Sequence, residues 1–125
     1  MDSNDKSKSE LKRLMKSFTY ALQGLRRAFL EERNLQIHVF LSLVVISLGF
    51  ITDIQPSEWI VLLLVIGGMF TMELLNTAIE NVVDLVTKEY HPIAKKAKDI
   101  AAGAVLIYAI TAVIVGIIIF YPYFF

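Results

Sequence analysis

Four polar residues in an otherwise apolar segment near the middle of the chain are the first candidates for chemistry. Glu73, Asn76, Glu80 and Asp84 interrupt an apolar run that begins at Trp59. At 100° per residue on an α-helix, these four side chains fall within roughly 80° of one another. Acidic groups are costly in hydrocarbon, so an acidic stripe on a membrane helix is by default a candidate functional site.

The polar stripe suits phosphoryl transfer from a nucleotide to a lipid hydroxyl. Carboxylates near the inner end of a span are suitable ligands for Mg²⁺, which prefers carboxylate and phosphate oxygens. Glu73 lies roughly 10 Å from Glu80 along a helix, at the depth of a lipid headgroup, where a carboxylate can act as a base. The chain has no G-x-x-x-x-G-K-[ST] loop and no H-R-D or D-F-G triplet, so such a kinase would need a different scaffold.

Composition indicates an integral membrane protein. Of 125 residues 56% are hydrophobic, and the mean hydropathy is +0.61. The formal net charge is zero, which gives no reason to expect a nucleic-acid partner, and the absence of cysteine excludes disulfides and thiolate metal sites. We therefore expect one all-α membrane domain over residues 1–125, with transmembrane helices at 35–51, 59–83 and 100–120.

The charges predict how these spans are oriented in the cell membrane. Most lysines and arginines precede the first span, and the others lie between the second and third spans: Lys6, Lys8, Lys12, Arg13, Lys16, Arg26, Arg27 and Arg33, then Lys88, Lys95, Lys96 and Lys98. The loop between the first two spans has none. By the positive-inside rule, the N-terminus is cytoplasmic and the C-terminus lies outside.

Two polar segments border the spans. Residues 9–33 alternate apolar and basic positions with helical spacing, which predicts an amphipathic surface helix with Ser9 as its N-cap, preceded by a disordered tail at 1–8. Pro92 suits the first turn of the last helix, which then carries lysines at 95, 96 and 98. Cations usually avoid a helix N-terminus, so these lysines predict a bound anion.

Two strings of residues are recognisable. Residues 73–84 read ELLNTAIENVVD and residues 94–105 read AKKAKDIAAGAV, and together with residues 24–32 (GLRRAFLEE) they resemble the prokaryotic diacylglycerol kinase family over nearly the whole chain. The resemblance implies a surface helix followed by three transmembrane helices. It also implies a homotrimer whose active sites form between neighbouring subunits, with ATP and Mg²⁺ as cosubstrate and cofactor.

The resemblance also implies roles for individual residues. Glu73 would be the general base for the lipid hydroxyl, and Asn76 would orient groups in the site. Glu32 and Glu80 would hold the Mg²⁺ that is bound to ATP. Lys98 would contact the transferred phosphates, with Asp99 beside it in the nucleotide pocket. The remaining nucleotide or headgroup contacts would come from Arg13, Tyr20, Glu89, Tyr90 and His91.

Within this family the chain resembles the Gram-positive undecaprenol kinases, on the basis of residues 90–99 (YHPIAKKAKD). His38 stands where diacylglycerol-specific enzymes often carry an acidic residue, and Ala102 stands where they have a serine. The resemblance therefore favours undecaprenol as the lipid alcohol, with diacylglycerol as the alternative substrate.

Plainer interpretations of the same residues stay open. Glu73 and Asn76 could instead form hydrogen bonds between helices, and Glu80 and Asp84 could be solvated residues at a helix end. Lys95 and Lys96 also serve as topology signals. Two non-enzymatic classes follow: a small oligomeric channel or carrier, which would depend on Glu73 more than on Lys98 or Glu32, and a membrane adaptor, which would tolerate the loss of all three.

Overall fold

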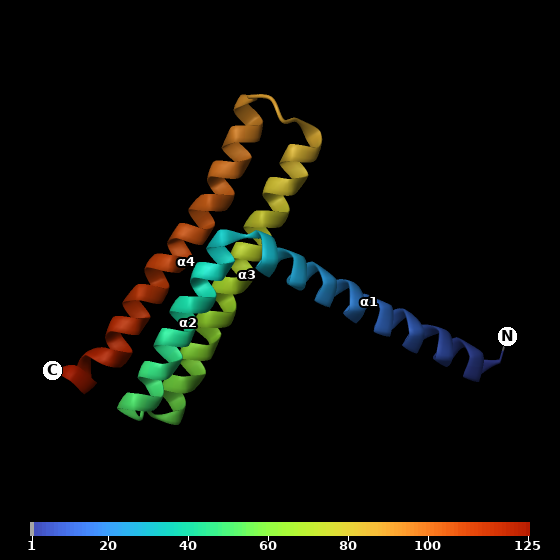
Figure 1. Cartoon of the computed structure of the whole chain (residues 1–125). Helices are drawn as coiled ribbons and strands as arrows, with labels where there is room; N and C mark the ends of the chain where they lie inside the picture. Colours follow the sequence, from blue (N-terminus) through green and yellow to red (C-terminus); the bar gives the residue numbers. More distant parts are fainter. Residues whose placement is uncertain (1) are drawn as a thin grey trace. The chain divides into compact units, whose positions relative to one another are not determined.

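The computed structural model describes residues 2–125 as four α-helices joined by short connections (Figure 1). The helices are α1 (Ser3–Glu31), α2 (Arg33–Thr52), α3 (Pro56–Val86) and α4 (Pro92–Phe124). The chain divides into two units, Met1–Arg33 and Asn34–Phe125. The first unit contains α1, and the second contains nearly all of α2 together with α3 and α4. The all-α prediction is confirmed.

Helix α1 begins earlier than the sequence analysis predicted. The side chain of Asp2 accepts a hydrogen bond from the backbone N–H of Ser3 at 2.9 Å and caps the helix. No glycine or proline separates Asp2 from Ser9, so nothing interrupts the helix there. The predicted N-cap at Ser9 and the predicted disorder before it are therefore wrong for residues 3–8, and residue 1 lies outside the described residues. The helix ends at Glu31, with Glu32 as its C-cap, rather than at residue 33.

Helices α2, α3 and α4 are each long and apolar enough to cross a membrane. They contain the predicted spans 35–51, 59–83 and 100–120, and they extend each of them at both ends. The 20 residues of α2 correspond to about 30 Å, which is the thickness of the hydrocarbon slab. The prediction of three helices with the length and apolar composition of membrane spans is confirmed.

The starts of α3 and α4 are fixed by local capping. The carboxylate of Glu58 accepts a hydrogen bond from the backbone N–H of Gln55 at 2.9 Å, and Pro56 takes the first helical position. At α4, Nδ1 of His91 accepts a hydrogen bond from the backbone N–H of Ile93 at 3.2 Å, and Pro92 follows His91 directly. The predicted place of Pro92 in the first turn of the last helix is confirmed.

Helices α3 and α4 run antiparallel and are joined at one end by residues 87–91 (Figure 1). A small apolar core lies toward the other end of this pair and includes Ile54, Leu62, Ile119 and Phe120. Val45 and Leu48 of α2 pack against the same core. Most other large apolar side chains of these three helices are exposed, as is expected of helices that face lipid or further subunits.

A close contact sets how near α4 approaches the middle of α3. The Tyr108 hydroxyl of α4 donates a hydrogen bond to the backbone carbonyl of Leu64 at 3.2 Å. A Cβ atom on Gly68 would lie 1.7 Å from that hydroxyl oxygen, so only glycine leaves room for the tyrosine. This contact holds the two helices that carry most of the candidate site.

Candidate functional site

The polar stripe of α3 faces the inside of the second unit. Glu73 is only 4% exposed and is the one buried charged or polar residue among those described. Asn76, Glu80 and Asp84 are half-buried, whereas the intervening apolar residues Leu75, Ile79, Val82 and Leu85 are exposed. The prediction that the four polar residues share one face is confirmed, and that face is the sheltered one, where an intramembrane acid is normally found.

Glu73 is hydrogen-bonded to a histidine of the neighbouring helix. Nε2 of His38 on α2 lies 3.2 Å from Oε1 of Glu73. The two side chains are 22% and 6% exposed, so water only partly reaches the pair. The sequence analysis did not connect these residues. The available signal was that His38 is the only ionisable residue between Arg33 and Asp53 in an otherwise apolar span.

Asn76 and Glu80 lie one helical turn apart and contact each other. The Asn76 amide donates a hydrogen bond to Oε1 of Glu80 at 3.3 Å. Its carbonyl oxygen, Oδ1, is buried and has no hydrogen-bonding partner among the described residues. A buried acceptor that lacks a donor normally indicates a missing partner, such as water, an ion or a ligand.

These oxygens fit Mg²⁺. The ion takes few ligands from protein and completes its octahedron with water and phosphate oxygens, so the Glu80 carboxylate beside the orphaned Asn76 oxygen is a suitable partial ligand set. No group of three or more His, Asp or Glu side chains converges within residues 2–125. A Mg²⁺ ion at this position would therefore take its remaining ligands from the nucleotide, water or another chain.

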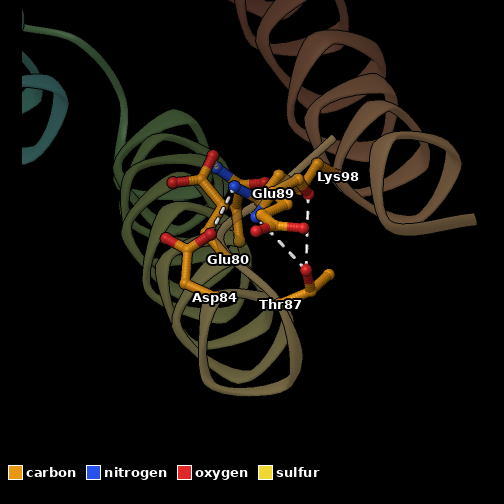
Figure 2. Close-up of polar contacts among 6 residues, drawn as sticks. Glu80, Asp84, Thr87, Glu89 and Lys98 are labelled. Carbon is orange, nitrogen blue, oxygen red and sulfur yellow. Dashed lines mark hydrogen bonds and ion pairs between the residues drawn. The ribbon is translucent and has the colours of Figure 1, made fainter. Parts of the chain in front are cut away.

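Asp84 is paired with Lys98 across the two helices. Nζ of Lys98 on α4 donates a hydrogen bond to Oδ1 of Asp84 on α3 at 2.6 Å, and Figure 2 shows the lysine side chain reaching toward this carboxylate. Lys98 precedes the apolar run that begins at Ile100. The hydrogen bond from Asp84, opposed by desolvation and assisted by the charges of Asp84 and Glu80, raises the pKa of the lysine above its usual value. The raised pKa favours the protonated form of Lys98 beside the Asp84 carboxylate.

An open pocket of about 360 Å³ lies where α3 connects to α4. It gathers five of the predicted nucleotide or headgroup residues, together with the Asp84 carboxylate: Glu89, Tyr90, His91, Lys98 and Asp99. The backbone N–H of Glu89 donates to the Thr87 hydroxyl at 3.2 Å and shapes the turn (Figure 2).

Two of these residues have partners that the sequence analysis did not predict. His91 caps α4 through Nδ1, so this ring nitrogen is already engaged in a hydrogen bond within the chain. Asp99 forms an ion pair with Lys95, one helical turn away, rather than with Lys98. Lys98 and Asp99 both line the pocket, but Lys98 is paired with Asp84 and Asp99 is paired with Lys95.

Three predicted site residues belong to the first unit. Arg13 and Tyr20 are exposed on α1 and are seven residues apart, which places them on the same side of the helix. Glu32 is the half-buried C-cap residue of α1, and its backbone N–H donates to the Ala28 carbonyl at 2.8 Å. Glu80 lies in the second unit, so joint metal binding by Glu32 and Glu80 stays a prediction.

Comparison with known proteins identifies related sequences. A family model described as prokaryotic diacylglycerol kinase matches residues 19–120. A Bacillus subtilis (strain 168) protein named undecaprenol kinase is 48% identical over 122 residues, which cover 98% of each chain. A Synechocystis protein named diacylglycerol kinase is 48% identical over 82% of this chain and 59% of its own length. An Escherichia coli (strain K12) protein with the same name is 32% identical over 90% of this chain and 92% of its own.

Proposed function

The chain belongs to the prokaryotic diacylglycerol kinase family, and on this premise we propose that it transfers the γ-phosphoryl group of ATP to the hydroxyl of undecaprenol. The observation that carries the proposal is the 48% identity, over 98% of both chains, to a protein named undecaprenol kinase. Its three membrane-spanning helices make the chain a multi-pass membrane protein, in which a polyprenol substrate is within reach.

Glu73 is the general base of the proposed reaction. It takes the proton of the lipid hydroxyl while that oxygen forms a bond to the γ-phosphorus, and the bond from phosphorus to the β–γ bridging oxygen breaks as ADP leaves. The sheltered position of Glu73 on α3 supports this role, because water does not compete with the lipid hydroxyl there. Asn76, one turn nearer the pocket, orients the reacting groups.

Glu80 and Glu32 are the proposed ligands of the Mg²⁺ that accompanies ATP. Mg²⁺, when bound, neutralises charge on the phosphates. The partnerless Asn76 oxygen next to Glu80 supports a cation at this position.

Lys98 is the proposed contact to the transferred phosphates, and the pocket between α3 and α4 is the proposed nucleotide site. Lys98 and its partner Asp84 both line this pocket, so the lysine ammonium can exchange the carboxylate for a phosphate oxygen. Glu89, Tyr90, His91 and Asp99 line the same pocket, and Arg13 and Tyr20 of α1 are proposed to complete the nucleotide and headgroup contacts.

The proposed assembly is a homotrimer with active sites shared between subunits. Two features of the single chain support it: the extensive exposed apolar surface of α2–α4, and a metal ligand set that one chain leaves incomplete. We place the N-terminus and the α3–α4 connection in the cytoplasm and the C-terminus outside, with α1 as an amphipathic helix on the inner membrane surface.

Diacylglycerol is the second candidate substrate. The relatives from Synechocystis and Escherichia coli are named diacylglycerol kinase, and the first of these equals the Bacillus protein in percentage identity. The match to the Synechocystis protein covers less of both chains than the match to the Bacillus protein, so we rank diacylglycerol second.

A phosphoryl-transfer assay tests the proposed function. The purified, folded protein in lipid bilayers should transfer labelled γ-phosphate from ATP to undecaprenol when Mg²⁺ is present, and should stop when Mg²⁺ is chelated. Phosphate transfer to neither undecaprenol nor diacylglycerol would contradict a lipid kinase of either kind. Ion flux without ATP consumption would instead favour a channel or carrier.

A further inference from the structure

We propose that His38 is a positioning residue of the reaction, which holds one oxygen of the Glu73 carboxylate so that the other is presented to the lipid hydroxyl. This inference rests on the proposed function, in which Glu73 is the base. The observation that carries it is the 3.2 Å contact between Nε2 of His38 on α2 and Oε1 of Glu73 on α3.

The proposed base role fixes the direction of the contact. A carboxylate must be ionised to take a proton, and an ionised carboxylate only accepts hydrogen bonds, so in the reacting form Nε2 of His38 donates to Oε1 of Glu73. His38 is the one hydrogen-bonding partner of this carboxylate within the described residues, so Oε2 stays available to accept a proton. A base that is held through one oxygen and reacts through the other has a defined orientation.

Packing on both helices restricts the pair. Leu35 lies three residues before His38 on the same side of α2 and is fully buried, and Met69 lies one turn before Glu73 on α3 and is 6% exposed. His38 therefore lies on a helix face that is packed against its neighbours, and this packing restricts the position of the imidazole. The carboxylate is buried as well, where a hydrogen-bond donor matters more than it does in water.

Two near-isosteric variants separate positioning from packing. The side-chain amide nitrogen of glutamine can reach the place of the imidazole Nε2, whereas the shorter asparagine amide matches Nδ1 and falls short of Glu73. His38→Gln should therefore restore the hydrogen bond, while His38→Asn and His38→Leu should not. Ser47→Ala on the same helix serves as a control, because the Ser47 hydroxyl bonds only the carbonyl of Leu43 on its own helix.

The experiment measures kcat and the KM for Mg²⁺–ATP of each variant in undecaprenol-containing bilayers, with thermal unfolding as a check of the fold. We expect His38→Gln to stay within about threefold of the wild type, and His38→Asn and His38→Leu to lose about 10–10²-fold in kcat at unchanged KM for ATP. If His38→Leu does not fold, the comparison between glutamine and asparagine carries the test.

Three results would overturn the inference while leaving the proposed function intact, namely wild-type kcat in all three His38 variants, an equal loss in the glutamine and asparagine variants, or a change confined to the KM for ATP. An inactive wild-type protein would instead overturn the proposed function, and this inference with it.

Discussion

Three polar pairs lie along the inner face of α3, and each pair contains a residue to which we assign a role in the proposed reaction. His38 holds Glu73, Asn76 contacts Glu80, and Lys98 neutralises Asp84. From Glu73 to Asp84 the helix rises about 16 Å. The pairs therefore follow one another along α3 toward the pocket at the α3–α4 connection, in the order of the proposed base, the proposed metal ligand and the proposed phosphate contact.

The general base gives the sharpest prediction at the residue scale. Glu73→Gln should lower kcat by roughly 10²–10⁴-fold, because the amide cannot accept the hydroxyl proton, while the affinity for Mg²⁺–ATP stays the same. Turnover assays and nucleotide titration in bilayers measure the two effects. Glu10→Gln on exposed α1 is the matched control and should behave as the wild type. Near-normal turnover of Glu73→Gln would remove this residue from the base role.

The metal ligand gives a different prediction. Glu80→Gln removes the carboxylate that we assign to Mg²⁺, so the Mg²⁺ concentration needed for half-maximal rate should rise by about tenfold or more. The measurement is a Mg²⁺ titration of the rate at fixed ATP, compared with Glu73→Gln, whose weak residual rate should keep the wild-type Mg²⁺ dependence. An unchanged Mg²⁺ dependence in Glu80→Gln would show that the ligand assignment is wrong.

Lys98 can be compared with a neighbouring lysine. Lys98→Gln should raise the KM for Mg²⁺–ATP by about 10–10²-fold, since a charged hydrogen bond to phosphate is lost. Lys96 is exposed, lies two residues away and is outside the pocket at the α3–α4 connection, so Lys96→Gln should change little. Steady-state kinetics over a range of ATP concentrations measures both. Equal effects of the two substitutions would indicate that these lysines act only through overall charge.

At the scale of elements, the sequence predicted what depends on local pattern. The three spans follow from the length of the apolar runs, and the common face of the polar stripe follows from helical spacing. The start of α1 differs from the sequence prediction, because the polar character of residues 3–8 predicts disorder, whereas Asp2 caps the helix and no residue there breaks it.

Contacts between elements were beyond the reach of the sequence. His38 and Glu73 are 35 residues apart, and they are in contact only because of the axial register in which α2 packs against α3. The pairing of Lys98 with Asp84 depends in the same way on the approach of α4 to α3. Local spacing does not encode such a register, because it results from side-chain packing along the whole length of two helices.

The contact between Gly68 and Tyr108 gives a stability prediction at this scale. Gly68→Ala forces the tyrosine away and removes its hydrogen bond to the Leu64 carbonyl, which should destabilise the packing of α3 against α4 by about 1–3 kcal/mol. Gly67→Ala is a matched control, since a Cβ atom there has no other atom within 4 Å. Thermal unfolding in detergent should show a lower Tm for Gly68→Ala only. An equal Tm for the two variants would show that the contact does not stabilise the pair.

At the scale of the whole molecule, the proposed Mg²⁺ site needs more ligands than the described residues bring together, because no group of three or more His, Asp or Glu side chains converges within residues 2–125. A closed trimer in which each site takes Glu32 from one subunit and Glu80 from the next would complete the set.

Subunit mixing tests this assembly. At a low Mg²⁺ concentration, well below the one that Glu80→Gln needs for half-maximal rate, Glu32→Gln and Glu80→Gln should each lose most of their activity alone. Random mixed trimers should recover up to about a quarter of the wild-type rate, because some interfaces then combine two intact glutamates. The measurement is the rate after the two variants are unfolded together and refolded into bilayers, with separately refolded samples as the control. No recovery in well-folded mixed trimers would place both glutamates in the same subunit.

The central claim is that this membrane protein phosphorylates a polyprenol, and a competition assay tests it most directly. Undecaprenol and diacylglycerol are placed at equal mole fraction in one bilayer with Mg²⁺ and γ-labelled ATP, and the two phosphorylated lipids are separated and counted. We expect faster initial formation of undecaprenyl phosphate than of phosphatidic acid, with both products lost in Glu73→Gln. Label in phosphatidic acid alone would contradict the proposed substrate, and label in neither lipid would contradict the proposed reaction.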